Sequence, residues 1–399
     1  MYRSIYVPFD NSAHALRAAE IAVAIAAQAG GELSASHVHA ASLHERRFRQ
    51  MEGGLPERYR SEKALTEQRE IHGELIAHGL QLISDSYLDV VSAKCAQAAV
   101  PCRRVTLEGK NWQRLVQDIN ASSHDLVVMG ALGLGAVDCS VLGSVCERVA
   151  RRIERDLLVV KSLPADQPGG IVVAIDGSEH SYGALQAALA LARIFDRPVE
   201  ALAVYDPFFH YAAFQSIAGV LSPAAAAVFR FEEQERLHGQ IIDGGLARIY
   251  QGHLDVAVKL AAEQGVRLSA TLLAGKALEQ ILDELHRRKP WLLAAGRAGI
   301  HADGETDVGS TAENLLRLAQ CNVLLAARRV APALGHVADT TLEWTGEAQA
   351  RMQRVPDFAR EMARRAVMRH AVERGHTVIT SDVIDSCLRG SGAKCPYKR

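Results

Sequence analysis

The sequence predicts two doubly wound, Rossmann-like α/β domains in tandem, each built on a five-stranded parallel sheet, followed by a small all-α domain. Two observations support this prediction: strand-like apolar runs alternate with helical stretches, and the whole pattern occurs twice. Hydrophobic residues make up 48% of the chain and aromatic residues only 5%, as is typical of helices packed on parallel strands. We expect domains at 1–163 and 168–329, a linker at 330–342, a helical domain at 343–390 and a tail at 391–399.

Composition narrows the functional classes. The 45 Lys and Arg residues nearly balance the 46 Asp and Glu residues, so no global charge favours nucleic acid or an anionic membrane. The N-terminal stretch lacks the pattern of a signal peptide, and no uncharged apolar run reaches about 18 residues. The seven cysteines form no CxxC pair and no metal-finger spacing, which favours reduced thiols. We expect a cytoplasmic protein with neither nucleic-acid nor membrane partners.

An internal repeat fixes the architecture. Asp10 and Asp176 each end an apolar run, and they lie 166 residues apart. The same offset relates Gly109-Lys110 to Gly275-Lys276, Gly130 to Gly296, Gly133 to Gly299, and Gly143-Ser144 to Gly309-Ser310. A shared register over this many positions indicates two copies of one domain.

Each copy is predicted to alternate five strands with four helices. In the first copy we expect strands near 3–9, 33–38, 103–108, 125–130 and 157–161, and helices at 12–29, 111–122 and 144–154. Continuous apolar runs such as DLVVMG and WLLAAG are typical of strands covered on both faces. Strands that alternate with helices imply right-handed crossovers into a parallel sheet.

A long helical stretch is expected between the second and third strands of each copy, at 57–99 and 222–264. Both stretches contain EQxxxHG, at Glu67–Gly73 and Glu233–Gly239. A metal or catalytic role for the histidine is one interpretation. Close packing of helices at a small glycine, with a hydrogen-bonded histidine beside it, explains the pair without chemistry. We assign it no functional role.

The candidate site is a glycine-rich loop after the fourth strand of each copy. It reads G-x-x-G, nine residues, G-S, and comprises Gly130, Gly133, Gly143 and Ser144 in the first copy and Gly296, Gly299, Gly309 and Ser310 in the second. Ligands of open parallel sheets bind beyond the carboxyl ends of the strands, where this loop must lie. Glycines admit phosphate to the backbone, and the helix that follows favours anions.

Two further points bear on this loop. A glycine pattern alone also fits a tight strand-to-helix connection without a ligand. However, each copy places an aspartate, Asp10 or Asp176, at the end of its first strand, near the same crevice. Such a carboxylate can accept hydrogen bonds from ribose or adenine.

These motifs resemble the universal stress protein family, in the branch that binds ATP. The resemblance lies in the openings VPFDNS and AIDGSEHS, in GALGLGAVDCSVLGSVCERV followed by LLVVK, and in GRAGIHADGETDVGSTAENL followed by VLLAA. It covers residues 1–328 and implies a five-stranded parallel sheet that binds ATP or ADP.

The resemblance also implies roles for individual residues. Pro8, Asp10 and Asp176 match the nucleoside-contacting end of the first strand, and Val38 and Val204 match the second-strand residue whose backbone meets adenine. The two glycine loops, with Ser144 and Ser310, match the phosphate-binding loop. The family further implies that domains pair through their last strands. A tandem chain can satisfy this internally as a pseudo-dimer, and further homodimerisation stays open.

The two copies differ in charge. The second loop contains Asp303, Glu305 and Asp307, and a carboxylate 4 Å from a phosphate costs about 1 kcal/mol in water and about 4 kcal/mol at an effective dielectric of 20. Either a Mg²⁺ ion intervenes or nucleotide binding is weak there; a simply solvated loop is the common case. The first loop contains only Asp138 and is the better predicted site. The first copy also differs at the start of its first helix, where it has Asn11 and the second copy has Gly177.

The C-terminal segment predicts three short helices, beginning after Trp344, at Pro356 and after Thr380, with stops at Gly375 and Gly390. It is similar to the small C-terminal domain of the light-independent protochlorophyllide reductase B subunit, but the catalytic and iron–sulfur parts of that enzyme have no counterpart. The resemblance lies in Trp344, Ala348, Met352, Val355, Pro356, Phe358, Arg360, Arg364, Gly375, Thr380 and Val383. So short a segment buries little surface alone, so we expect it to dock on a protein partner or on the preceding domains. Its arginines fit either a solvated helix face or a surface for an anion, a nucleic acid or a partner.

The leading functional hypothesis is a nucleotide-responsive stress protein that is not an enzyme. The sequence has no Walker lysine, no Ser/His/Asp set and no paired carboxylates at an identifiable cleft. Two alternatives stay open: an ATP hydrolase of low turnover, and a nucleotide-free scaffold that acts through its C-terminal helices.

Overall fold

The computed structural model describes residues 1–164, 168–207, 245–300, 308–333, 336–337 and 342–390. These residues fall into two compact units. The first comprises Met1–Ala174, Ser178–Glu200 and Leu278–Arg329, and the second comprises Ile175–Gly177, Ala201–Ala277 and Val330–Arg399. The boundary between the units therefore runs within the second sequence repeat.

The first repeat folds as predicted. Its strands are β1 (Ser4–Pro8), β2 (Glu32–His39), β3 (Cys102–Glu108), β4 (Leu126–Gly130) and β5 (Asp156–Val160). They pair in parallel in the order β3-β2-β1-β4-β5. This order places the carboxyl ends of β1 and β4, two adjacent strands that begin their connections in opposite directions, at the switch point of the sheet.

The strands of the second repeat are β6 (Ile171–Ala174), β7 (Val199–Tyr205), β8 (Leu268–Ala274), β9 (Leu292–Gly296) and β10 (Asn322–Ala326). Within the first unit, β6 pairs with β9 and β9 pairs with β10, both in parallel. Strand β8 and most of β7 belong to the second unit.

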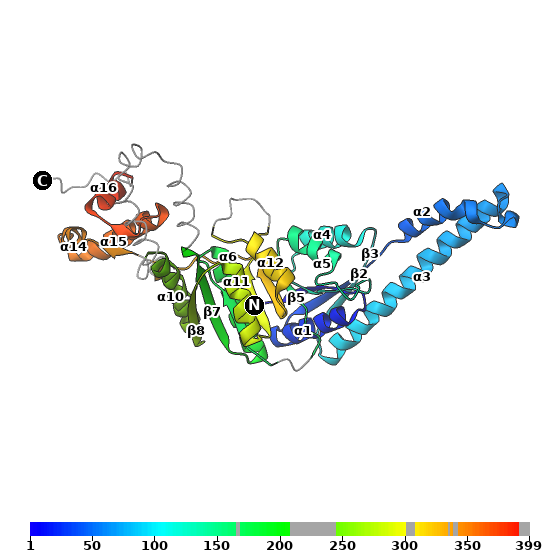
Figure 1. Cartoon of the computed structure of the whole chain (residues 1–399), viewed down its shortest axis with the longest axis horizontal. Coiled ribbons are helices and arrows are strands. Elements are labelled where there is room, and N and C mark those ends of the chain that lie inside the picture. Colours follow the sequence, from blue (N-terminus) through cyan, green and yellow to red (C-terminus); the bar gives the residue numbers. More distant parts are fainter. Residues whose placement is uncertain (165–167, 208–244, 301–307, 334–335, 338–341, 391–399) are drawn as a thin grey trace, which may run out of the picture. The chain divides into compact units, whose positions relative to one another are not determined.

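Helices cover both faces of the first repeat. They are α1 (Ala13–Ala29), α2 (Ala41–Met51), α3 (Glu62–Gln97), α4 (Asn111–Ala121) and α5 (Ser144–Arg152). Figure 1 shows α4 and α5 on one face of the sheet and α1 on the other. The corresponding helices of the second repeat are α6 (Glu179–Phe195), α10 (Ala247–Glu263), α11 (Ala277–Arg288) and α12 (Ser310–Leu318).

The first helix of each repeat begins at a serine cap. The Ser12 hydroxyl accepts a hydrogen bond from the Ala15 N–H, and Ser178 accepts one from Ser181. Each cap satisfies one of the amide donors that a helix N-terminus leaves open. Alanine is the commonest buried residue of both helices, joined by isoleucine and valine in α1 and by leucine in α6, so both helices can approach the sheet closely.

The two repeats join through their last strands, β5 and β10. These strands pair antiparallel, with Val159 opposite Val323 and Leu158 opposite Leu324. Every residue of both strands is buried. The sheet of the first unit therefore continues from one repeat into the other, in the order β3-β2-β1-β4-β5-β10-β9-β6.

The buried carboxylate of Asp156 stabilises the junction between β5 and β10. Asp156, at the start of β5, is 3% exposed. It accepts hydrogen bonds from the Tyr2 hydroxyl at 2.7 Å and from the backbone N–H groups of Ala327 and Arg328 at 2.9 and 3.1 Å. The Arg328 side chain adds an ion pair at 2.5 Å and stacks on the Tyr2 ring. One charge thus links the first strand region of repeat one to the end of repeat two.

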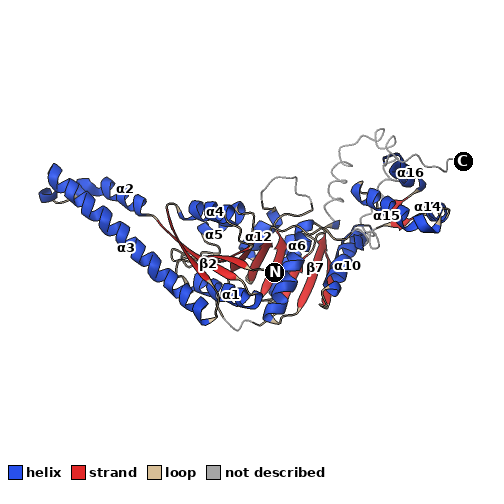
Figure 2. Ribbon diagram, turned by 180° about the vertical axis from the view of Figure 1, so that it is seen from behind, coloured by secondary structure: helices blue, strands red, loops and turns tan. Residues whose placement is uncertain are grey.

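The long helical stretch predicted at 57–99 contains α3, and α2, which the sequence analysis did not predict, packs against it to form a helical hairpin. Figure 2 shows it extending away from the sheet. His72 stacks on Phe48 of α2, with ring centroids 4.0 Å apart, and a Cβ at Gly73 would lie 3.5 Å from the Glu45 side chain. The His-Gly pair lies where the two helices meet, beside a hollow of about 470 Å³. Its counterpart, Glu233–Gly239, lies outside the described residues.

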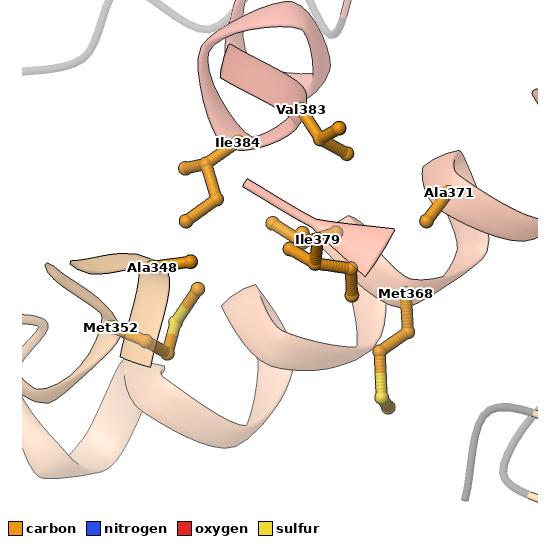
Figure 3. Close-up of a cluster of buried hydrophobic side chains, with 8 residues drawn as sticks. Ala348, Met352, Met368, Ala371, Ile379, Val383 and Ile384 are labelled. Atoms are coloured by element: carbon orange, nitrogen blue, oxygen red, sulfur yellow. The ribbon is translucent and has the colours of Figure 1, made fainter. Parts of the chain in front are cut away.

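The C-terminal segment forms the three expected helices, α14 (Gly346–Gln353), α15 (Asp357–Glu373) and α16 (Ser381–Gly390). Figure 3 shows their shared apolar core, which contains Ala348, Met352, Val367, Met368, Ala371, Ile379, Val383 and Ile384. The chain also adds a short parallel pair, β11 (Glu343–Trp344) with β12 (Val378–Ile379), so this unit is not purely helical. Two-residue strands give too little periodicity to be seen in sequence.

We predict that Asp156→Ala lowers the free energy of unfolding by about 3 kcal/mol, because it leaves the buried Tyr2 hydroxyl and the partly exposed Arg328 guanidinium without their partner. Urea unfolding of the full chain measures this loss. Asp89→Ala is the matched control, since Asp89 pairs with Arg104 on the surface, with 66% of its side chain exposed. That change should cost less than about 1 kcal/mol. Equal losses for the two variants would contradict the role of Asp156.

Candidate functional site

The turn from β1 into α1 carries the first predicted site residue, Asp10. Its Oδ1 accepts a hydrogen bond from the Ser12 N–H at 3.1 Å. Asn11, between them, adopts a left-handed backbone with φ +62°, and its counterpart Gly177 has φ +86°. Asparagine and glycine are the residues that adopt this conformation most readily. Although the residue differs, both repeats therefore have a left-handed backbone at this position.

Two hydrogen bonds attach this turn to the glycine loop. Asp10 Oδ2 accepts from the Leu134 N–H at 3.1 Å, and the Ser12 hydroxyl donates to the Leu132 carbonyl at 3.1 Å. The structure therefore brings Asp10 and the loop together, although 124 residues separate Asp10 from Leu134. Each carboxylate oxygen keeps further acceptor capacity for a ligand.

The glycines of the loop are required by close approach. A Cβ at Gly130 would lie 2.7 Å from the backbone of His14 and Ala15, and one at Gly133 would lie 2.5 Å from Asp10 Oδ2. A Cβ at Gly143 would lie 3.0 Å from the Ala131 carbonyl, to which its own N–H is bonded. Any side chain at these positions would push the loop away from β1 and α1.

The loop ends at the N-terminus of α5. Gly143 is the N-cap and provides no side-chain hydrogen bond, so the first amides of α5 have no side-chain cap. Ser144, the first helical residue, is exposed. Uncapped amides and the helix dipole favour an anion, and a serine hydroxyl adds a donor. These residues fit the phosphate groups of a nucleotide.

Val38 and Pro8 lie at the carboxyl ends of the neighbouring strands. Pro8 pairs with Ser36 in the last registered rung between β1 and β2, and the Ser36 carbonyl accepts the Phe9 N–H. Because hydrogen bonding alternates along a parallel strand, the peptide groups of Val38 also face the side of β1, two residues beyond that rung. This orientation suits recognition of a planar base by backbone.

Two histidines that the sequence did not single out flank Val38. His37 Nδ1 lies 2.8 Å from the Ser84 hydroxyl and His39 Nδ1 lies 3.3 Å from it. The Ser84 hydroxyl donates to the Leu80 carbonyl, so both imidazoles donate to its oxygen. Burial lowers the pKa of His37. The His-x-His spacing on a predicted strand was the signal, since alternate residues share a face.

The second loop repeats part of this arrangement within the first unit. The Ser178 hydroxyl donates to the Ala298 carbonyl at 3.4 Å, and a Cβ at Gly296 would lie 2.9 Å from His180 and Ser181. Gly309 caps α12, which begins at Ser310. Gly299 is the last residue of the G-x-x-G turn, all of which is described. Asp303, Glu305 and Asp307 lie outside the described residues.

Asp176 has a different environment from Asp10. It lies in the second unit with Val204, Tyr250 and His253. A Cβ at Gly177 would lie within 2.6 Å of three ring atoms of His253, and the Tyr250 ring contacts His253 edge-on. Burial raises the pKa of Tyr250, and the Asp176 charge adds to the rise. Aromatic side chains of α10 thus pack against the turn that carries Asp176.

Over the described part of the chain, no group of three or more His, Cys, Asp or Glu side chains could hold a metal ion. Among the same residues, no helix is both long and apolar enough to cross a membrane.

Comparison with known proteins decides the family. The profile described as the universal stress protein family matches residues 1–161 and again 170–327. The chain belongs to this family. A universal stress protein of Methanocaldococcus jannaschii is 29% identical over 161 residues, which cover 40% of this chain and 83% of that protein.

Solved structures that are similar to this chain include universal stress proteins. One from Archaeoglobus fulgidus aligns over 81% of this chain and 97% of its own, with 14% identity and a TM-score of 0.48. A putative universal stress protein from Pseudomonas aeruginosa aligns over 85% and 96%, with 14% identity and a TM-score of 0.49. Residues 344–387 match the profile of the proto-chlorophyllide reductase 57 kD subunit.

We predict opposite effects for two changes at Asn11. Asn11→Gly should keep or raise the free energy of unfolding, whereas Asn11→Ala should lower it by about 1 kcal/mol. Of these three residues, Ala tolerates a positive φ least well. Urea unfolding separates them, with Asn111→Ala in the first turn of α4 as the control. If Gly and Ala were equally destabilising, the turn would not require the left-handed backbone.

We also predict that His253 makes stability depend on pH. Burial lowers its pKa below the ordinary value near 6.5, and Asp176 opposes this shift. The unfolded chain then binds the proton more readily, so this contribution is present above about pH 6.5 and is lost as the pH falls below it. His253→Gln should flatten the decline between about pH 7.5 and 5.5 in urea unfolding. The exposed His286→Gln should leave the slope unchanged.

Proposed function

We propose that the first repeat binds an adenine nucleotide, ATP or ADP, and that its occupancy regulates a stress response. The observation that carries the proposal is the hydrogen-bonded contact of Asp10 with the glycine loop, directly before the uncapped N-terminus of α5. A carboxylate for the nucleoside and amides for the phosphates converge at the switch point of one sheet.

Each part has a role in this proposal. The first amides of α5 and the Ser144 hydroxyl would donate to phosphate oxygens. Asp10 would accept hydrogen bonds from the ribose, and the backbone of Val38, next to Pro8, would meet the edge of adenine. Gly130, Gly133 and Gly143 would act by leaving the backbone close enough to do this.

The second repeat is proposed as the weaker site. The His253 ring packs against Gly177, the residue after Asp176, and moving a packed aromatic side chain to admit a ligand would cost binding energy. In the sequence, Val204 of the second unit and Gly296, Gly299, Gly309 and Ser310 of the first unit each keep the family pattern. Any Mg²⁺ dependence would come from Asp303, Glu305 and Asp307, so nucleotide titrations should be run with and without Mg²⁺.

We propose no catalytic step for this protein. We also propose that it acts in the cytoplasm. Both oxygens of Asp10 accept backbone hydrogen bonds, which suits a binding group better than a general base. Partner binding is proposed for the C-terminal helices, where Phe358 and Met362 of α15 are 92% and 72% exposed. Nucleotide occupancy would then alter the affinity for that partner.

The test is to denature the purified full chain, quantify any released nucleotide, and titrate the emptied protein with ATP and ADP. We expect about one nucleotide per chain. Gly133→Val should abolish it, because the new side chain meets Asp10. Gly299→Val, the equivalent change in the second repeat, should leave it in place. Absence of binding in repeated extractions and titrations would refute the proposal.

A further inference from the structure

A cluster of cations surrounds Trp112 on the face of the sheet that α4 and α5 cover. The Arg152 guanidinium lies 4.8 Å from the indole centroid, Lys110 Nζ lies 5.6 Å away and the Arg148 guanidinium 5.8 Å away. All three charges thus lie around one ring, at separations near or below the Debye length of about 10 Å at 0.1 M salt. They repel one another with little screening.

No carboxylate offsets these charges. Within the described residues, Lys110, Arg148 and Arg152 form no salt bridge, whereas their neighbour Arg151 pairs with Glu147 and Glu313. Among the described residues, the buried indole Nε1 of Trp112 has no hydrogen-bond partner, which is unusual for a buried donor. The accessible part of the cluster is its excess positive charge.

The helix beside the cluster adds to the positive potential. Lys110 is the N-cap of α4, and its side chain provides no capping hydrogen bond. A cation at this end of a helix opposes the helix dipole. Dipole considerations do favour Arg152 at the C-terminus of α5, but they explain neither Lys110 nor the unpaired indole.

The second repeat shows that the fold does not need this cluster. At the same offset of 166 residues, Trp112, Arg148 and Arg152 correspond to Leu278, Asn314 and Leu318. These residues occupy equivalent positions on α11 and α12. Only the lysine, as Lys276, is kept. Helix packing of the same kind is thus achieved without the aromatic ring or the two arginines.

We propose that Lys110, Trp112, Arg148 and Arg152 bind a compact, multiply charged phosphate anion, at a site separate from the glycine loop. Guanidinium groups bind phosphate oxygens in pairs, and an ammonium group binds them as a point charge. Three cations around one ring suit several phosphate charges in a small volume better than an extended polymer. Two sources supply such an anion: a free polyphosphate, and the distal phosphates of a nucleotide whose nucleoside is held on the loop.

The experiment is calorimetric titration of the full chain with tripolyphosphate. We expect saturable binding that weakens as salt is raised. The variant Trp112→Leu, Arg148→Asn, Arg152→Leu installs the residues of the second repeat and should weaken binding roughly tenfold or more. Arg46→Ala with Arg47→Ala, on α2, removes two exposed charges elsewhere and should change it little. If the triple variant does not fold by circular dichroism, Arg148→Asn alone should still show a measurable loss.

Two further arms identify the source of the phosphates. Gly133→Val should retain tripolyphosphate binding even though it abolishes nucleotide binding, so this proposal and the proposed function can fail separately. ATP that competes with tripolyphosphate only in the wild type would assign the cluster to the distal phosphates of the loop nucleotide. Loss of tripolyphosphate binding in Gly133→Val would overturn a separate site. Equal affinity for the triple variant, or for an octaglutamate peptide, would overturn phosphate recognition.

Discussion

The antiparallel ladder between β5 and β10 is the constraint on which the rest of the first unit depends. Both strands are buried along their whole length, so each has a neighbour on either side and neither forms an edge. Asp156 then ties the start of β5 to Tyr2 and to Arg328 beyond β10. With those ends fixed, β4 is held beside β5 and β1 beside β4, and the loops at their carboxyl ends have a rigid support.

The candidate site follows from that support. Asp10 and Ser12 end one strand, and the glycine loop follows another. Because the strands are parallel neighbours, their connections emerge at the same edge of the sheet. The contact between them consists of short-range hydrogen bonds that tolerate no Cβ at Gly130 or Gly133. The site is therefore determined by backbone proximity, and only Asp10 and the serines contribute side-chain chemistry.

The repeats use one fold for different surroundings. Asn11 and Gly177 adopt the same left-handed turn, yet His253 covers Gly177. The repeats also differ around Trp112. The first repeat has Arg148 and Arg152 where the second has Asn314 and Leu318. Strand and helix positions are kept by the core alanines, valines and leucines, whereas surface and turn positions are free to diverge. A duplicated domain can thus keep its sheet while its ligand-facing residues change.

The sequence by itself determined the tandem α/β architecture, the strands of the first repeat, all of its longer helices except α2, and the candidate loop. Those features depend on local periodicity, on glycine and on a repeat with constant spacing. Tertiary structure alone decided that Asp10 bonds to Leu134, that His253 lies over Gly177 and that three cations surround Trp112. Each of these contacts joins residues from different elements. Local propensity carries no information about which side chains a crossover brings together.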